Sequence, residues 1–164
     1  MNKKILTLFA VFLVAVSLAS VCAAELTKEN DFDGVFKMKV AEGDNFTNMS
    51  DYQSASSFLH SSMAYVNDNE TVYVFVFTGS TLESAISSMT LGDIDAQYGH
   101  KEGNISKEGD LILFNKTPAM EDALKDYSID TFAGINDSNK QLTVFVGGNN
   151  PDLVKEYAET IVVN

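Results

Sequence analysis

The 164-residue chain contains no arginine, one cysteine and two histidines. The single cysteine, Cys22, cannot form a disulfide within the chain, so the fold must depend on its apolar core. Without arginine, the chain has no planar guanidinium group to bind phosphate through two hydrogen bonds. A formal net charge of −12 also repels polyanions, so both features argue against nucleic-acid binding. The same charge is repelled by anionic lipid headgroups. Cations, basic partners or plain solubility are the compatible interpretations.

The first 24 residues have the pattern of a secretory leader. Lys3 and Lys4 precede an apolar run over 5–19, and small residues follow up to Ala24. The apolar run is shorter than the about 20 residues that a spanning helix needs. We therefore expect cleavage after Ala23 or Ala24 and no membrane span in the mature protein.

Cys22 permits a second interpretation, in which it becomes the acylated first residue of a lipoprotein. Val21 argues against this, because a smaller residue usually precedes the lipidated cysteine. A retained N-terminal anchor is the third possibility. Removal of residues 1–24 would leave nine lysines against 23 acidic residues, a net charge of −14. The remaining chain is long enough for one domain that buries roughly two thirds of its surface.

An internal repeat is the strongest architectural signal. Residues 63–68 align with 132–137, and 69–76 align with 139–146, when one residue is skipped between the two blocks. Seven of the fourteen aligned positions are identical. The pattern predicts an ancestral duplication of a strand, turn, strand and helix unit. The two copies are expected to cover about 35–92 and 110–164.

The strongest predicted strands lie in the second half of each block, over 72–78 and 142–146, where β-branched and aromatic residues dominate. Within 72–78, valines alternate with aromatic residues, so both faces are apolar and the strand should be central in its sheet. Two further strands are predicted over 35–40 and 111–115. Residues 93–109, with three glycines, are predicted to link the two copies.

Helices are predicted after both strong strands. Ser80 and Glu83 have capping-box spacing, and Gly92 is the expected end of the first helix. Asn150 should cap the second helix, which continues from Pro151 to Val162. Thr117-Pro118 should begin a short helix through Lys125, and a helical turn is possible within 50–58.

These elements predict an α+β fold. The expected architecture is a single exported domain, 25–164, of two related strand–strand–helix halves, with a mostly antiparallel sheet and helices packed on one face.

Six Asn-x-Ser/Thr sequons lie beyond the leader, which makes N-glycosylation a candidate modification. Asn69 and Asn136 are predicted at hairpin tips, where a glycan would be solvated. Asn115 ends a predicted strand and should be a poorer acceptor. The candidate sites are therefore Asn45, Asn48, Asn69, Asn104 and Asn136.

Other chemical motifs are weak. His60 is followed by two serines and preceded by Asp51, which supplies the residue types of a hydrolase triad but no nucleophile-elbow glycine pattern. Asp31, Asp33 and the Asp93–Asp95 cluster do not continue as an EF-hand. Residues 147–150 lack the lysine of a phosphate-binding loop, so their glycines are expected to make a tight turn into the second helix. We predict no catalytic, cofactor or metal site.

Several segments resemble small exported or cell-surface proteins of methanogenic archaea with no assigned activity. The resemblance lies in Phe36–Val40 with Gly43, in residues 144–150 and in the closing helical segment 153–162. It implies an envelope or extracellular location and transfers no functional residue.

The sequence favours a non-enzymatic extracellular or cell-envelope interaction module with an unidentified partner. One alternative is an exported hydrolase that uses His60. Another is an envelope chaperone or inhibitor that uses an exposed sheet face or edge. The sequence leaves the partner and the oligomeric state open.

Overall fold

The computed structural model describes residues 25–49, 61–90 and 105–164. Within these ranges the chain forms two antiparallel sheets and a few short helices. The small sheet has the order β1 (Leu26–Phe32), β2 (Phe36–Ala41) and β10 (Val162–Val163). The large sheet has the order β3 (Phe46–Asn48), β4 (Met63–Asn67), β5 (Val72–Thr78), β9 (Leu142–Gly148), β8 (Thr131–Asp137), β7 (Leu111–Asn115) and β6 (Ile105–Glu108). The helices are α2 (Leu82–Thr90), the 3₁₀ turn Pro118–Met120, α3 (Glu121–Leu124) and α4 (Pro151–Glu159).

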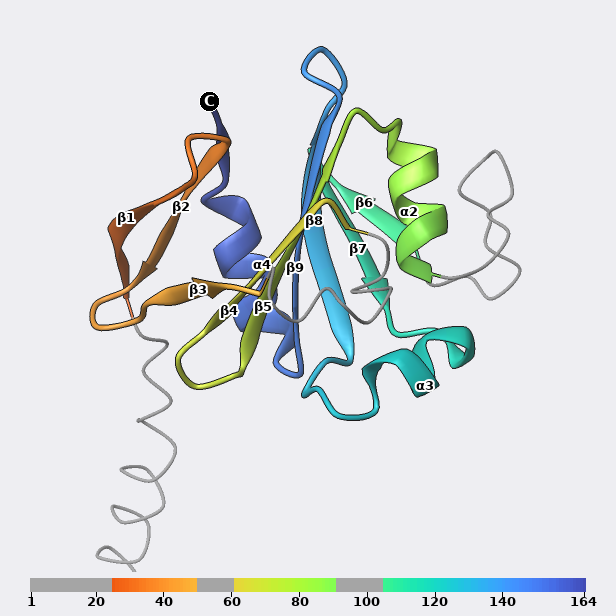
Figure 1. The fold of residues 1–164 in the computed structure, drawn as a ribbon, viewed down its shortest axis with the longest axis horizontal. Helices are drawn as coiled ribbons and strands as arrows, with labels where there is room; N and C mark the ends of the chain where they lie inside the picture. Colours follow the sequence, from red (N-terminus) through yellow and green to blue (C-terminus); the bar gives the residue numbers. More distant parts are fainter. Residues whose placement is uncertain (1–24, 50–60, 91–104) are drawn as a thin grey trace, which may run out of the picture.

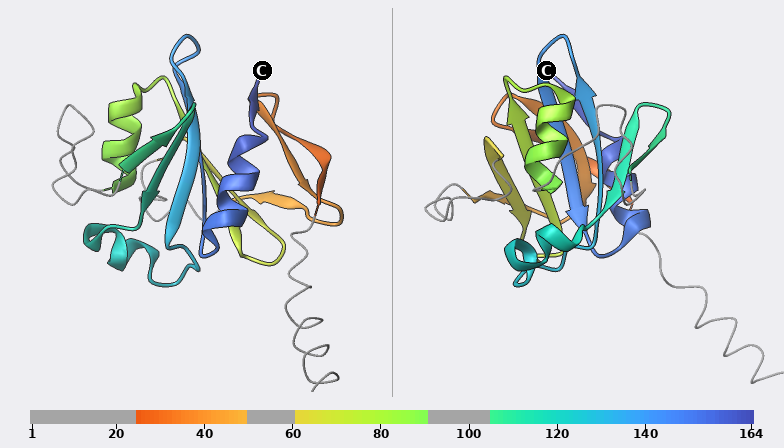
Figure 2. Two further views of the ribbon diagram at one scale, coloured as in Figure 1. Left: turned by 180° about the vertical axis from the view of Figure 1, so that it is seen from behind. Right: turned by 90° about the vertical axis from the view of Figure 1, so that its right-hand side faces the viewer.

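The helices lie on both faces of the large sheet. Figure 1 shows α4 between the small and large sheets, and Figure 2 shows α2 and α3 on the opposite side of the large sheet. The predicted α+β fold with helices on one face is therefore wrong. The described part of the molecule is mostly antiparallel β-sheet. A second sheet, built from β1, β2 and β10, covers α4 on the side away from the large sheet.

Strands β5 and β9 pair at the centre of the large sheet, as their apolar faces predict. Phe75 lies opposite Phe145, Val74 opposite Val146 and Val76 opposite Val144. Phe75 and Phe145 occupy matching places in the aligned repeat, so the pairing has a local twofold axis between them. All the paired valines and phenylalanines are fully buried.

The strand register corrects the alignment of the internal repeat, and the helix positions show that the repeat covers only the strands. Met63 pairs with Val76, whereas Ala133 pairs with the matching Val146. Met63 therefore corresponds to Ala133 rather than to Phe132, and the strand pairs match without a skipped residue. The correspondence ends at the helices, because α2 packs on one face of the sheet and α4 on the other. Common ancestry of the two halves stays a hypothesis.

One core lies between the two sheets. It combines the valine faces of β5 and β9 with the buried side of α4 and the inner face of β2, where Phe36, Met38 and Val40 are fully buried. Two phenol groups bind carboxylates at its edge. The Tyr65 hydroxyl donates to Asp33 Oδ2 at 2.6 Å, and the Tyr157 hydroxyl donates to Asp44 Oδ2 at 2.7 Å. These bonds tie the loops of the small sheet to β4 and α4.

The second core is aromatic and lies under α2 and α3. Tyr73 and Phe77 contribute to it, as expected for buried strand packing. The Phe114 ring stacks on Phe132 with centroids 4.8 Å apart and meets Phe145 edge-on at 5.2 Å. Such aromatic pairs add about 0.5–1.5 kcal/mol beyond the area they bury. With both faces packed, the large sheet is a rigid platform for the loops at its ends.

Two helix starts were predicted with different success. Asn150 caps α4 as expected, because its Oδ1 accepts from Leu153 N at 3.2 Å and Pro151 follows it. At α2 the side chain that accepts a first-turn amide is Thr81, from Ser84 N at 3.2 Å, rather than the predicted Ser80. The predicted end at Gly92 and the predicted helical turn near 50–58 lie outside the described residues.

Candidate functional site

A groove of about 690 Å³ lies beside the tip of the β8–β9 hairpin. Three segments far apart in sequence line it: the β6–β7 turn, residues 135–139 at the end of β8, and the chain end from α4 to β10. Ile135, Ala158 and Ile161 supply apolar lining. Its carboxylates are Glu108, Asp110, Asp137 and Glu159.

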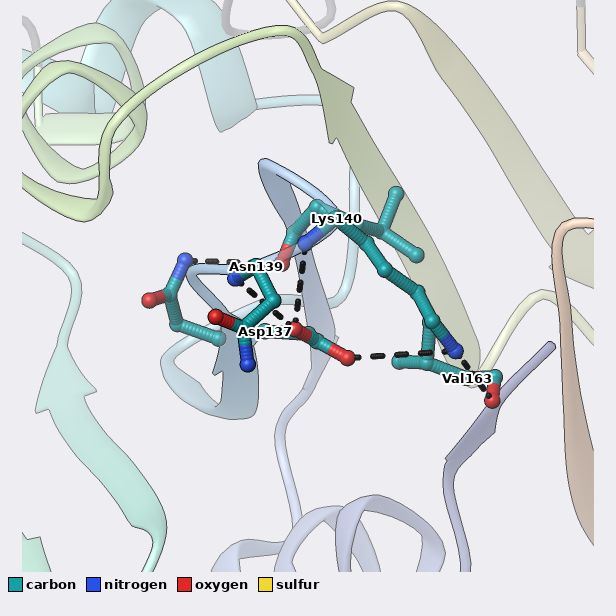
Figure 3. A network of polar contacts seen from close by, with 6 residues as sticks. Asp137, Asn139, Lys140 and Val163 are labelled. Atoms are coloured by element: carbon teal, nitrogen blue, oxygen red, sulfur yellow. Dashed lines mark hydrogen bonds and ion pairs between the residues drawn. The ribbon is translucent and has the colours of Figure 1, made fainter.

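The β8–β9 turn holds its shape through Asp137 (Figure 3). One carboxylate oxygen, Oδ1, accepts from Asn139 N at 3.0 Å and from Lys140 N at 3.2 Å. The other oxygen, Oδ2, lies 3.9 Å from Lys140 Nζ. An aspartate that binds the amides just after it fixes a turn, as these side chains often do. The turn wall of the groove is therefore preformed.

Lys140 also joins this turn to the end of the chain. Its Nζ donates to the carbonyl oxygen of Val163 at 3.2 Å, as Figure 3 shows. Val163 pairs with Phe36 of β2, and Asn164 N donates to Val35 O at 3.2 Å. The C-terminal strand is thus held from both sides, and its Val163 lines the groove.

Charge in the groove is only partly neutralised. Lys155 binds Glu108, and this hydrogen bond raises the pKa of Lys155 above its ordinary value. Lys140 lies near Asp137. Asp110 and Glu159 have no ion-pair partner within the described residues. The groove therefore keeps a negative field that attracts cations.

The lining suits recognition of cations by hydrogen bonds and charge. Carboxylates accept charge-assisted hydrogen bonds from ammonium or guanidinium groups. The Asn139 amide and the Ser138 hydroxyl add neutral donors and acceptors. Within the described ranges no group of three or more histidine, cysteine or acidic side chains could hold a metal ion.

The structure separates the predicted glycosylation sites by accessibility. Asn45, Asn48 and Asn69 are exposed, whereas Asn136 is half-buried within β8 rather than at a hairpin tip. Asn115, predicted to be a poorer acceptor, is exposed at the last residue of β7. Asn104 lies outside the described residues.

Other predicted chemistry falls into structural roles or outside the described part. Asp31 Oδ1 accepts from Gly34 N at 2.7 Å and closes the β1–β2 turn, while Asp33 binds Tyr65. Gly147 lies in β9 rather than in a turn. A side chain does not fit there, because a Cβ would meet the Phe132 and Phe75 rings. The other weak candidates lie outside the described ranges, namely Cys22, Asp51, His60, Asp93 and Asp95.

Sequence reasoning missed the groove, because its walls come from three segments whose proximity depends on sheet order. Only the acidic balance of the chain hinted at its charge. No helix within the described ranges has the length and apolar character that crossing a membrane requires. Comparisons with protein families, curated proteins and solved structures found no match to this chain.

Proposed function

We propose that this chain is an exported, non-enzymatic binding module of the cell envelope or the extracellular space, and that a cationic segment of a partner protein occupies the acidic groove. The observation that carries the proposal is the preformed groove itself. Its turn wall is fixed by Asp137, and Val163 of its lining belongs to a strand that Lys140 holds in place. A rigid site loses little conformational freedom on binding, which favours affinity.

The partner's charge follows from the carboxylates without ion-pair partners. Asp110 is exposed, as is Glu159, so each can meet a lysine or arginine of the partner in water. An exposed pair of this kind contributes about 0.2–1 kcal/mol. Two pairs at the middle of that range together account for about a tenfold change in affinity. Salt should weaken binding, since the Debye length falls to about 8 Å at physiological ionic strength.

The location rests on the leader-like first 24 residues and on the resemblance to exported archaeal proteins. Both stay predictions. Affinity purification of the protein from the envelope of its source cells, with mass spectrometry, would identify the processed N-terminus and any companion protein together. A protein recovered from the cytosol with residues 1–24 intact would contradict export.

The groove is tested with a lysine-rich peptide as probe. Asp110→Asn combined with Glu159→Gln should weaken binding about tenfold in a calorimetric titration, by the pair energies above. A control that combines Glu42→Gln with Asp126→Asn removes the same charge at exposed positions away from the groove. It should bind as the unmodified protein does. Equal weakening in both variants would show general charge attraction and would refute a specific site.

The two alternative functions have no specific observation in their favour. His60, on which the hydrolase hypothesis depends, lies outside the described residues. Val162 is the large hydrophobic side chain that the described surface exposes most clearly, with 61% of its area accessible. Both faces of the large sheet are packed at its centre, where β5 and β9 are buried.

A further inference from the structure

We propose that Asn69 is the position at which this fold accepts an N-linked glycan, and that Asn136, the matching sequon of the second hairpin, does not carry one. The two sites have similar local sequences: each is an Asn-x-Ser/Thr sequon next to a turn that contains aspartate. In the folded chain they differ in the exposure of the asparagine and in the hydrogen bonds of its Nδ2 nitrogen. The proposal is independent of what occupies the groove.

Asn69 presents its side chain to solvent. It lies in the β4–β5 turn, where Glu70 N donates to Asn67 O at 2.9 Å. Its side chain makes no hydrogen bond within the described residues, so the nitrogen Nδ2 is available. Thr71, which completes the sequon, is also exposed. A glycan at this position would extend into water without displacing protein atoms.

The turn is held by a residue outside the sequon. Asn67 is 3% exposed, and its Oδ1 accepts from Thr71 N at 2.9 Å and from Val72 N at 3.0 Å. Its Nδ2 donates to Thr71 Oγ1 at 3.1 Å. The shape of the hairpin tip therefore does not depend on the Asn69 side chain. Modification of Asn69 leaves every one of these bonds intact.

Asn136 has the opposite surroundings. Its Nδ2, the atom to which a sugar would be attached, donates to Thr143 Oγ1 at 2.8 Å and to Leu142 O at 3.4 Å. Thr143 is fully buried. A glycan on this nitrogen would break at least one of these bonds and force a half-buried strand residue outward. Leaving a buried hydroxyl without its partner costs about 1–3 kcal/mol.

The other described sequons are less suitable than Asn69. Asn45 Nδ2 donates to Asp68 Oδ2 at 2.9 Å, and Asn48 Nδ2 donates to Asp33 Oδ2 at 3.4 Å. At Asn115 the third residue of the sequon, Thr117, is only 4% exposed, so its hydroxyl cannot be recognised in the folded chain.

The transfer requires a lipid-phosphate-linked oligosaccharide as donor and an oligosaccharyl transferase. A bond forms between Asn69 Nδ2 and the anomeric carbon of the first sugar. The bond from that carbon to the phosphate oxygen breaks, and the lipid phosphate leaves with the electron pair. One Nδ2 proton passes to a base of the transferase. No oxidation or reduction takes place.

Glycopeptide mapping of the full chain purified from its source cells tests the proposal. Cleavage after Tyr65 and Tyr73 releases residues 66–73, which contain Asn69 as their only sequon. Cleavage after lysine releases residues 126–140, which contain Asn136 as their only sequon. We expect a sugar mass on the first peptide and the bare polypeptide mass for the second.

Two matched variants separate the sites without removing either asparagine. Thr71→Ala destroys the Asn69 sequon, and Ser138→Ala destroys the Asn136 sequon at an exposed position. The sugar mass should disappear in Thr71→Ala and persist in Ser138→Ala. Asn69→Gln provides the same loss if Thr71→Ala does not accumulate, because Asn69 makes none of the bonds of the turn. A bare 66–73 peptide in the natural protein, or sugar on residues 126–140, would overturn the proposal.

Discussion

The bond between Tyr157 and Asp44 gives a direct test of how the small sheet is held to the rest of the molecule. Tyr157→Phe keeps the ring, which is 1% exposed and meets the Phe46 ring edge-on at 6.2 Å, and removes only the hydroxyl. A hydrogen bond to a charged group contributes about 1.5–3 kcal/mol. Asp44 is half-buried, so water can reach its carboxylate in the variant. The free energy of unfolding should therefore fall by an amount near the lower end of that range, about 1.5 kcal/mol.

Urea unfolding of the purified protein at neutral pH measures this loss. Tyr73→Phe is the matched control, because its hydroxyl donates to a neutral acceptor, Glu70 O, at 3.0 Å. That bond should contribute about 1 kcal/mol. Tyr157→Phe should therefore shift the midpoint more than Tyr73→Phe does. A loss below about 0.5 kcal/mol in Tyr157→Phe would refute the idea that this bond holds α4 to the β2–β3 loop.

Alkaline pH tests the same bond by a second route. Burial raises the pKa of Tyr157 and of Tyr65 well above the ordinary tyrosine value, and the carboxylate beside each adds to the rise. Above about pH 10 the unfolded chain loses these protons while the folded chain keeps them. Stability is therefore complete below that pH and falls above it, by about 1.4 kcal/mol per pH unit for each tyrosine. Tyr157→Phe should remove the contribution of one tyrosine from this fall in the free energy of unfolding with pH. An unchanged dependence on pH would contradict the reasoning.

Substitutions at three further positions test the packing, the helix cap and the surface, each by urea unfolding. Gly134→Ala should cost about 3 kcal/mol or prevent folding, because the new Cβ would collide with Val144 O and the Phe145 ring; wild-type stability would refute the register of β8. Asn150→Ala should cost about 1 kcal/mol through loss of the cap on α4, and Asn150→Ser should restore most of it. Lys37→Met should leave the urea midpoint close to that of the unmodified protein, since the ion pair with Glu29 is exposed; a clear fall in the midpoint would show that this ion pair stabilises the small sheet.

The central part of the fold was predictable because each of its segments carries a complete local signal. Residues 72–78 alternate valine with aromatic residues, and their burial on both faces confirms the prediction of a central strand. The start of α4 was equally clear, since Asn150 and Pro151 occupy positions that favour a helix. The short helical segment after Thr117 is also confirmed.

In the small sheet only β2 was predicted, as the strand over 35–40. Strands β1 and β10 carry weak signals of their own and depend on pairing with β2. Strand β1 is mostly polar, with only its two end residues buried, and it forms because β2 offers an edge. The final helix was expected to reach Val162 but ends at Glu159. There Thr160 Oγ1 accepts from Lys39 N at 2.9 Å, and Val162 pairs with Lys37.

The remaining misses have similar physical causes. Residues 105–108 were assigned to a linker, yet they form the edge strand β6, whose exposed side chains resemble those of a loop. Asn136 was placed at a hairpin tip because asparagine and aspartate favour turns, whereas the register of β8 and β9 places it one residue inside the strand. The acidic groove depends on this same register and on the position of β10, so no single segment could reveal it.

The pairing of β10 with β2 has a consequence for how the protein is made. Lys39 and Thr160 meet although 121 residues separate them, so the outer layer cannot be complete until both of these segments have been synthesised. Contacts this distant are slow to form, because a long loop must close before they stabilise anything. We therefore expect the addition of β10 to β2 to be among the last steps of folding.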